Sequence, residues 1–155
     1  MIALRSRTLA LLLAVGWGVL VWTMLTSTKV AVGPWYPWMP WVWNLGHAPL
    51  FGVQAALIGL VLRPGRVPGP DAPRADGVAR RAFFLGAALA LVYGVLIEWR
   101  QAQVPGRHAS GLDVITDAVG ALGVPWALAT GALFSRRALV VFLVASIAAL
   151  LATYA

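Results

Sequence analysis

Charged residues are scarce in this chain of 155 residues, which contains 12 Lys and Arg and only 5 Asp and Glu. They make up 11% of the sequence, whereas about a quarter of the residues are charged in a typical soluble domain. So few charges do not cover the surface of a water-soluble domain, and 61% of the residues are hydrophobic. The composition therefore excludes a soluble domain, a disordered chain, a coiled coil and collagen, and it predicts an integral membrane protein.

Cysteine is absent, which excludes disulfides, thiolate nucleophiles and Cys-ligated metals and leaves the redox compartment open. We predict no cofactor and no bound metal. The net charge of +7 would suggest a nucleic-acid partner if the protein were soluble. In a membrane protein, basic residues beside apolar segments instead set the orientation and contact anionic headgroups. We therefore expect membrane lipids as partners and no nucleic acid.

Apolar segments recur along the chain, and each is close to the roughly 20 residues that cross a bilayer core as a helix. They cover residues 9–26, 45–62, 82–99, 113–134 and 138–155. The first begins like a signal peptide, but its apolar run is long and no convincing cleavage site follows, so we predict a retained helix. The expected fold is an all-α, multi-pass bundle of about five transmembrane helices, forming a single domain over residues 1–155.

The basic residues predict the orientation of these helices, because Lys and Arg collect on the cytoplasmic side of a membrane. With the N-terminus inside, the cytoplasmic side holds Arg5, Arg7, Arg63, Arg66, Arg74, Arg80, Arg81, Arg136 and Arg137. The outer side holds only Lys29, Arg100 and Arg107. We therefore predict a protein of the cell membrane with a cytoplasmic N-terminus. Residues 63–81, which contain four prolines, are expected to form an irregular cytoplasmic linker.

An aromatic segment, GPWYPWMPWVW, covers residues 33–43 and holds four Trp. Tryptophan and tyrosine favour the membrane–water interface, and the prolines argue against a continuous helix. The composition favours an anchor that lies flat on the outer leaflet. The alternative is a platform for a sugar or an aromatic ligand.

Most of the remaining polar residues gather on the outer side of the predicted bundle. Ionisable side chains at helix ends inside a membrane protein are candidates for a functional site. The candidate residues are His47, Glu98, Gln101, Arg107, Ser110, Asp113 and Asp117, with Gln54 and His108 as secondary members.

Helical spacing brings some of these side chains together. Glu98 and Gln101 are three residues apart and share a helix face. Asp113, Asp117 and Gly120 fall within a narrow arc, and the glycine offers a place where another helix can approach closely.

His47 and Gln54 are seven residues apart, which places Gln54 two turns deeper on the same face if the helix is regular. Pro49 lies between them and is tolerated in the first turn of a helix. We therefore expect a helix that begins at Pro49, with His47 just before its first turn.

The segment VPGRHASGLD connects the third and fourth predicted helices. Ser110 and Asp113 resemble a capping box, so we expect the fourth helix to begin near Gly111. We predict an anion site at this helix start, because it has free amides and a positive dipole end and follows Arg107 and His108. Asp113 adds negative charge there.

Residues 98–123 resemble the signature of the VanZ-like membrane protein family. That signature has Glu-x-x-Gln, Pro-Gly-Arg, Ser-x-x-Asp, Asn four residues later and then Gly. The matching positions are Glu98, Gln101, Pro105, Gly106, Arg107, Ser110, Asp113, Asp117 and Gly120. His47 and Phe51 resemble the family's earlier His and Phe, four residues apart.

Two positions depart from the family pattern. Asp117 stands where the family usually has Asn, and Trp43 and Asn44 stand where an acidic–basic pair usually precedes the His. The resemblance implies a small multi-pass protein of the cell envelope. The family is named for a protein linked to resistance against the glycopeptide teicoplanin, and the likeness implies no established reaction.

Our first hypothesis is that the protein binds a ligand at the outer leaflet. The ligand would be a lipid headgroup, a lipid-linked cell-wall precursor or an amphiphilic glycopeptide. Arg107 and the N-terminus of the fourth helix would hold an anionic group. Glu98, Gln101 and His47 would supply hydrogen bonds, and the aromatic segment would flank the entrance.

Two alternatives belong to other classes. In a structural or partner-binding protein, the polar residues would form a clasp between helices. Small residues would then serve helix packing at Gly86, Gly94, Gly120 and Gly123. In a membrane-embedded enzyme acting on lipid-linked headgroups, His47 and the carboxylates would be acid–base groups or ligands of a hard metal. The sequence leaves open whether the protein is an enzyme, and what its oligomeric state is.

Overall fold

The computed structural model describes residues 2–27, 36, 39–63, 74–105, 109–129, 140, 143–147 and 149–151. Its long helices are α1 (Ile2–Thr26), α2 (Met39–Leu62), α3 (Arg74–Gln101) and α4 (Gly111–Ala129). Residues 143–147 and 149–151 are also helical, and the described part of the chain contains no strand. The prediction of an all-α fold is confirmed for these residues.

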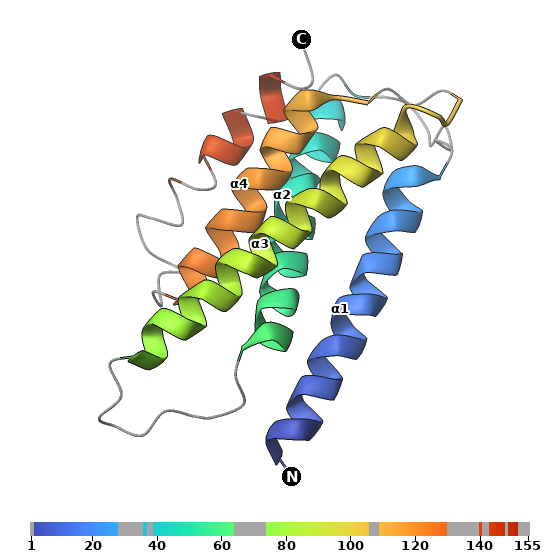
Figure 1. Cartoon of the computed structure of the whole chain (residues 1–155). Helices are drawn as coiled ribbons and strands as arrows, with labels where there is room; N and C mark the ends of the chain where they lie inside the picture. Colours follow the sequence, from blue (N-terminus) through green and yellow to red (C-terminus); the bar gives the residue numbers. More distant parts are fainter. Residues whose placement is uncertain are drawn as a thin grey trace.

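The long helices run alternately up and down (Figure 1). At one end, which we call the upper end, α1 and α3 finish and α2 and α4 begin. The central helix is α2, which packs against α3, α4 and α1. The first helix lies at the edge of the bundle and packs mainly on α2.

Three helices have the length and composition needed to cross a membrane within the described residues. Their apolar stretches are Arg7–Thr26, Trp41–Leu62 and Arg80–Gln101. Large apolar side chains on their outer faces are exposed, for example Leu12 and Phe84, as expected where lipid is the solvent. The helix α4 occupies the fourth predicted segment, and the fifth predicted segment contains the helical residues 143–147 and 149–151.

All four long helices begin before the apolar segments that predicted them, and the difference is largest for α1 and α3. The first begins at Ile2 instead of residue 9, and α3 begins at Arg74 instead of residue 82. Hydrophobicity marks only the part of a helix that faces lipid, whereas Arg and Ala favour helix in any surroundings. The prediction of an irregular linker is therefore wrong for residues 74–81, and residues 64–73 lie outside the described part of the chain.

The second helix begins at Met39, so the prediction that it starts at Pro49 is wrong. Pro40 is the second residue of α2, where the missing N–H needs no partner. Pro49 lies inside α2, as tolerated in membrane helices whose neighbours compensate for the lost backbone bond. His47 consequently lies within a continuous helix.

The start of α2 also corrects the interpretation of the aromatic segment. Residues 39–43 are helical, so the expectation that the prolines exclude a continuous helix is wrong for this half of the segment. Trp41 donates a hydrogen bond from Nε1 to the carbonyl oxygen of Ser146 at 3.2 Å, which joins α2 to the fifth segment. In the other half, the described residues include only Tyr36, which is exposed.

Glycine allows α2 and α4 to touch along their backbones. A Cβ atom at Gly120 would overlap the carbonyl oxygen of Ala48. One helical turn later on α2, a Cβ atom at Gly52 would lie 2.8 Å from the Cβ atom of Val124. The predicted close approach at Gly120 is therefore present, and α2 is its partner.

At the crossing of α2 and α3, a glycine again lets two helix backbones come close together. A Cβ atom at Gly86 would lie 2.5 Å from the carbonyl oxygen of Ala55 and 2.7 Å from the backbone nitrogen of Gly59. Close packing of small residues is a main source of helix association in membranes, because lipid chains are as apolar as the helices.

We predict that Gly120→Ala destabilises the bundle, because the added methyl group forces α2 and α4 apart and overpacking costs about 1–3 kcal/mol. Gly16→Ala is the matched control, since no described atom lies within 4 Å of a Cβ atom there. Thermal unfolding in detergent, followed by circular dichroism, should show a lower midpoint for Gly120→Ala only. Equal midpoints for the two variants would contradict the close crossing.

Candidate functional site

A buried histidine and a buried aspartate connect α2 to α4 near the upper end. His47 Nδ1 lies 2.9 Å from Asp117 Oδ1, and the two residues are only 6% and 1% exposed. They lie beside the crossing that Gly120 permits. The carboxylate of Asp117 is therefore the partner of the histidine ring.

Glu98 connects the end of α3 to the beginning of α4. Its Oε2 atom accepts a hydrogen bond from the backbone N–H of Ser110 at 2.7 Å. The predicted start of α4 at Gly111 is confirmed, and the carbonyl oxygen of Ser110 accepts the backbone N–H of Asp113 at 3.1 Å.

The contact between Glu98 and Ser110 places a carboxylate of the protein at the predicted anion site. The N–H of Ser110 is the group that a capping box would pair with the side chain of residue 113, and here it donates to Glu98. The negative group at the beginning of α4 is thus a carboxylate of the protein itself.

The two glutamines of the candidate site attach the rest of the bundle to α1. Gln101 Nε2 donates to the carbonyl oxygen of Leu25 at 3.0 Å, and Gln54 Nε2 donates to that of Ala14 at 3.3 Å. Both glutamines are buried. Burial of these residues is consistent with the shared faces that we predicted for Glu98 with Gln101 and for Gln54 with His47. The amide groups of both glutamines nevertheless donate to α1 and not to the other candidate residues.

The charged groups form one electrostatic cluster. Asp113 is buried in the first turn of α4, and His47 interacts electrostatically with Asp113 and Glu98 as well as with Asp117. Carboxylates that share a poorly solvated space repel one another unless a cation or a hydrogen-bond donor lies between them. The imidazole of His47 contacts the carboxyl group of Asp117, and the neighbouring carboxyl groups of Asp113 and Glu98 add negative charge that favours such a partner.

Carboxylate oxygens from two different helices, Glu98 Oε1 and Asp117 Oδ2, are buried and have no hydrogen-bond partner among the described residues. Asp117 Oδ2 faces α3, where a Cβ atom at Gly94 would lie 2.8 Å away. Nearly all buried polar atoms in native proteins are hydrogen-bonded, so an unpartnered buried acceptor marks a place for a donor.

Two predicted members of the site, Arg107 and His108, lie outside the described residues. Arg100 is exposed at the end of α3, whereas Glu98 is buried. No group of three or more His, Asp or Glu in the described part of the chain is arranged to hold a metal ion.

Sequence reasoning missed two polar residues, the buried Thr116 and the partly buried Tyr93. Thr116 is completely buried and donates from Oγ1 to the carbonyl oxygen of Leu112 at 3.1 Å. Tyr93 donates from its hydroxyl to the carbonyl oxygen of Gly18. The signal for Tyr93 was its spacing of eight residues from Gln101, which places both on the side of α3 that faces α1.

Comparison with known proteins gave no match to any family model, any curated protein or any solved structure. The resemblance to the VanZ-like family stays a prediction that depends on the residues of the motif.

We predict that His47 and Asp117 are energetically coupled. Removing one partner leaves the other buried without its hydrogen bond, so each alanine variant should unfold more easily. The double variant should cost less than the two single variants together, by roughly 1–3 kcal/mol. Unfolding in mixed micelles with increasing dodecyl sulfate measures these differences. Gln103→Ala combined with His47→Ala is the control cycle, because Gln103 is exposed and its effect should be additive. Additive effects for His47 and Asp117 would refute the coupling.

Proposed function

We propose that this chain is a VanZ-like envelope protein that binds a headgroup rich in hydrogen-bond donors at the outer leaflet. The observation that carries the proposal is the presence of two buried, unpartnered acceptors from different helices, Glu98 Oε1 and Asp117 Oδ2. Ammonium and hydroxyl groups are the donors that complement carboxylate oxygens. Lipid headgroups, lipid-linked cell-wall precursors and amphiphilic glycopeptides all carry such donors.

The proposed topology has five spans and a cytoplasmic N-terminus, which puts the upper end of the bundle outside. Two observations support it. Nine of the 12 basic residues then lie on the cytoplasmic side, and three helices have the properties of membrane spans. In this orientation, the carboxylate cluster lies at the depth of the outer headgroups.

The charges of the cluster favour a zwitterionic headgroup over a simple anion. The carboxylates of Glu98, Asp113 and Asp117 attract an ammonium group, while Arg107 remains our candidate for an accompanying phosphate. Phosphatidylethanolamine is the simplest membrane lipid with both groups. Phosphatidylcholine has the same phosphate and the same net charge but no N–H donor, so it serves as a chemically matched comparison.

The second candidate function is a structural clasp, which a different set of contacts supports. His47 contacts Asp117, Glu98 accepts from Ser110, and Gln101 donates to Leu25, so each contact joins two helices or a helix to its connector. A clasp needs these contacts alone. It gives no role to the unpartnered oxygens of Glu98 and Asp117.

We predict that the protein in nanodiscs retains phosphatidylethanolamine in preference to phosphatidylcholine. Glu98→Gln and Asp117→Asn should weaken this preference, because an amide keeps the shape of the carboxylate and loses its charge. A charge-assisted hydrogen bond contributes about 1.5–3 kcal/mol, so the loss should be roughly tenfold or more. Native mass spectrometry of the extracted complexes measures the bound lipid.

Gln103→Ala is the control for this experiment, since Gln103 is an exposed polar residue just beyond α3. It should bind lipid like the unaltered protein. Equal retention of the two lipids would overturn the binding proposal. Normal retention by folded Glu98→Gln, combined with a lower unfolding midpoint, would instead support the clasp.

A further inference from the structure

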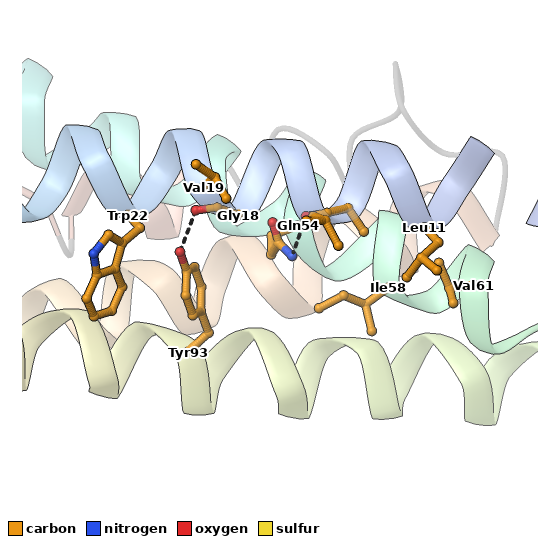
Figure 2. Close-up of a pocket in the computed structure, with 10 residues that line it drawn as sticks. Leu11, Gly18, Val19, Trp22, Gln54, Ile58, Val61 and Tyr93 are labelled. Carbon is orange, nitrogen blue, oxygen red and sulfur yellow. Dashed lines mark hydrogen bonds between the residues drawn. The ribbon is translucent and has the colours of Figure 1, made fainter. Parts of the chain in front are cut away.

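A groove of about 500 Å³ lies between α1, α2 and α3 (Figure 2). Aliphatic side chains line most of it, among them Leu11 of α1 and Ile58 and Val61 of α2. Trp22 and Tyr93 line the part nearest the upper end of the bundle. Its volume is in the range of small-molecule binding sites, roughly 300–1,000 Å³.

The position of the groove indicates the chemistry of its occupant. Its walls belong to the three apolar helices that have the properties of membrane spans. Along α1 it extends from Leu11 to Trp22, a rise of about 16 Å at 1.5 Å per residue. This is about half of a hydrocarbon core roughly 30 Å thick, so hydrocarbon chains surround the groove.

The two polar side chains of the groove direct their donors at α1. Gln54 Nε2 donates to the carbonyl oxygen of Ala14, and the Tyr93 hydroxyl donates to that of Gly18. These bonds are visible in Figure 2. Gln54 Oε1 is buried and has no hydrogen-bond partner among the described residues, but aliphatic side chains and the rings of Trp22 and Tyr93 form most of the walls, which therefore suit an apolar chain better than a polar molecule.

Aromatic rings connect the groove to the carboxylate cluster. The centroid of the Tyr93 ring lies 6.3 Å from that of Phe51, and Phe51 lies 6.2 Å from the ring of His47. His47 in turn contacts Asp117. The upper part of the groove and the polar cluster are therefore neighbours, with the rings of Tyr93 and Phe51 between them.

We propose that this groove holds one acyl chain of the phospholipid whose ammonium headgroup lies at Glu98 and Asp117. The inference rests on the proposed function and extends it from the headgroup to the chain. A chain gains no hydrophobic energy on leaving the bilayer for the groove, since both are apolar. The groove therefore selects by packing and fixes the position of the lipid, while the carboxylates select the headgroup.

The test uses phosphatidylethanolamine with a photoreactive diazirine on one acyl chain, in nanodiscs of phosphatidylcholine that contain the full chain. Light attaches the probe to the residues that it touches, and mass spectrometry identifies them. We expect labels on the groove residues Ala14, Ile58 and Val61, and we expect excess unlabelled phosphatidylethanolamine to suppress them. Labels spread evenly over exposed side chains such as Leu89 and Val92 would overturn the inference.

Ile58→Trp fills the groove with an apolar ring and should abolish the labelling of Ala14. Val15→Trp, on the α1 wall of the groove, is a second variant should the first fold poorly. Leu89→Trp is the matched control, because it adds the same ring at an exposed position of α3 that does not line the groove. The control should keep the groove labels.

The headgroup variants separate this inference from the proposed function. If folded Ile58→Trp retains phosphatidylethanolamine over phosphatidylcholine like the unaltered protein, the groove inference fails and headgroup binding stands. If Glu98→Gln combined with Asp117→Asn leaves the groove labels unchanged, and a phosphatidylcholine probe gives the same labels, headgroup binding fails and the groove holds chains of any lipid. Loss of groove labelling in both sets of variants supports both proposals.

Discussion

The backbone contact between α2 and α4 is the constraint on which the rest of the structure depends. Gly120 has no side chain, so the carbonyl of Ala48 lies directly against it. That contact puts His47, the residue before Ala48, beside Asp117, one turn before Gly120. With a larger residue at the crossing, the same imidazole and carboxylate would be held apart, and each would be buried without its partner.

In apolar surroundings, polar side chains form hydrogen bonds with backbone carbonyl groups. The donors of Gln54, Tyr93 and Gln101 all bind carbonyl oxygens of α1. Each carbonyl has two lone pairs, so it accepts these bonds without giving up its place in the helix. The polar residues of the bundle therefore divide into those that attach α1 and those that gather around His47. The second group retains the unpartnered carboxylate oxygens of Glu98 and Asp117, and for that reason we associate it with a ligand.

Much of this arrangement could be predicted from the sequence, and the failures have physical causes. Hydrophobicity predicted the apolar part of each long helix, the capping residues predicted the start of α4, and helical spacing predicted the shared face of Glu98 and Gln101. They could not show that Glu98 lies against Ser110, because that contact depends on how the connector between α3 and α4 folds back. Pro49 lies inside α2 and does not begin it, since a proline inside a packed bundle costs less than it does in an isolated helix. The sequence pattern does not show where two helices cross. It therefore could not predict that Gly52 lies against Val124 or that Gly86 lies against Ala55.

The attachment of α1 through its own carbonyls has a consequence for how this helix can vary and move. Carbonyl oxygens recur along every helix whatever its side chains, so the three donors recognise the shape of α1 and place few demands on its sequence. They also specify its axial position weakly, because a shift of one turn presents each donor with an equivalent oxygen. The register of α1 is instead fixed by side-chain packing, since Val21 and Leu25 are buried in the core of the bundle. The hydrogen bonds that α1 itself donates, from Trp17 to the carbonyl of Leu50 and from Arg7 to that of Arg63, also end on backbone oxygens.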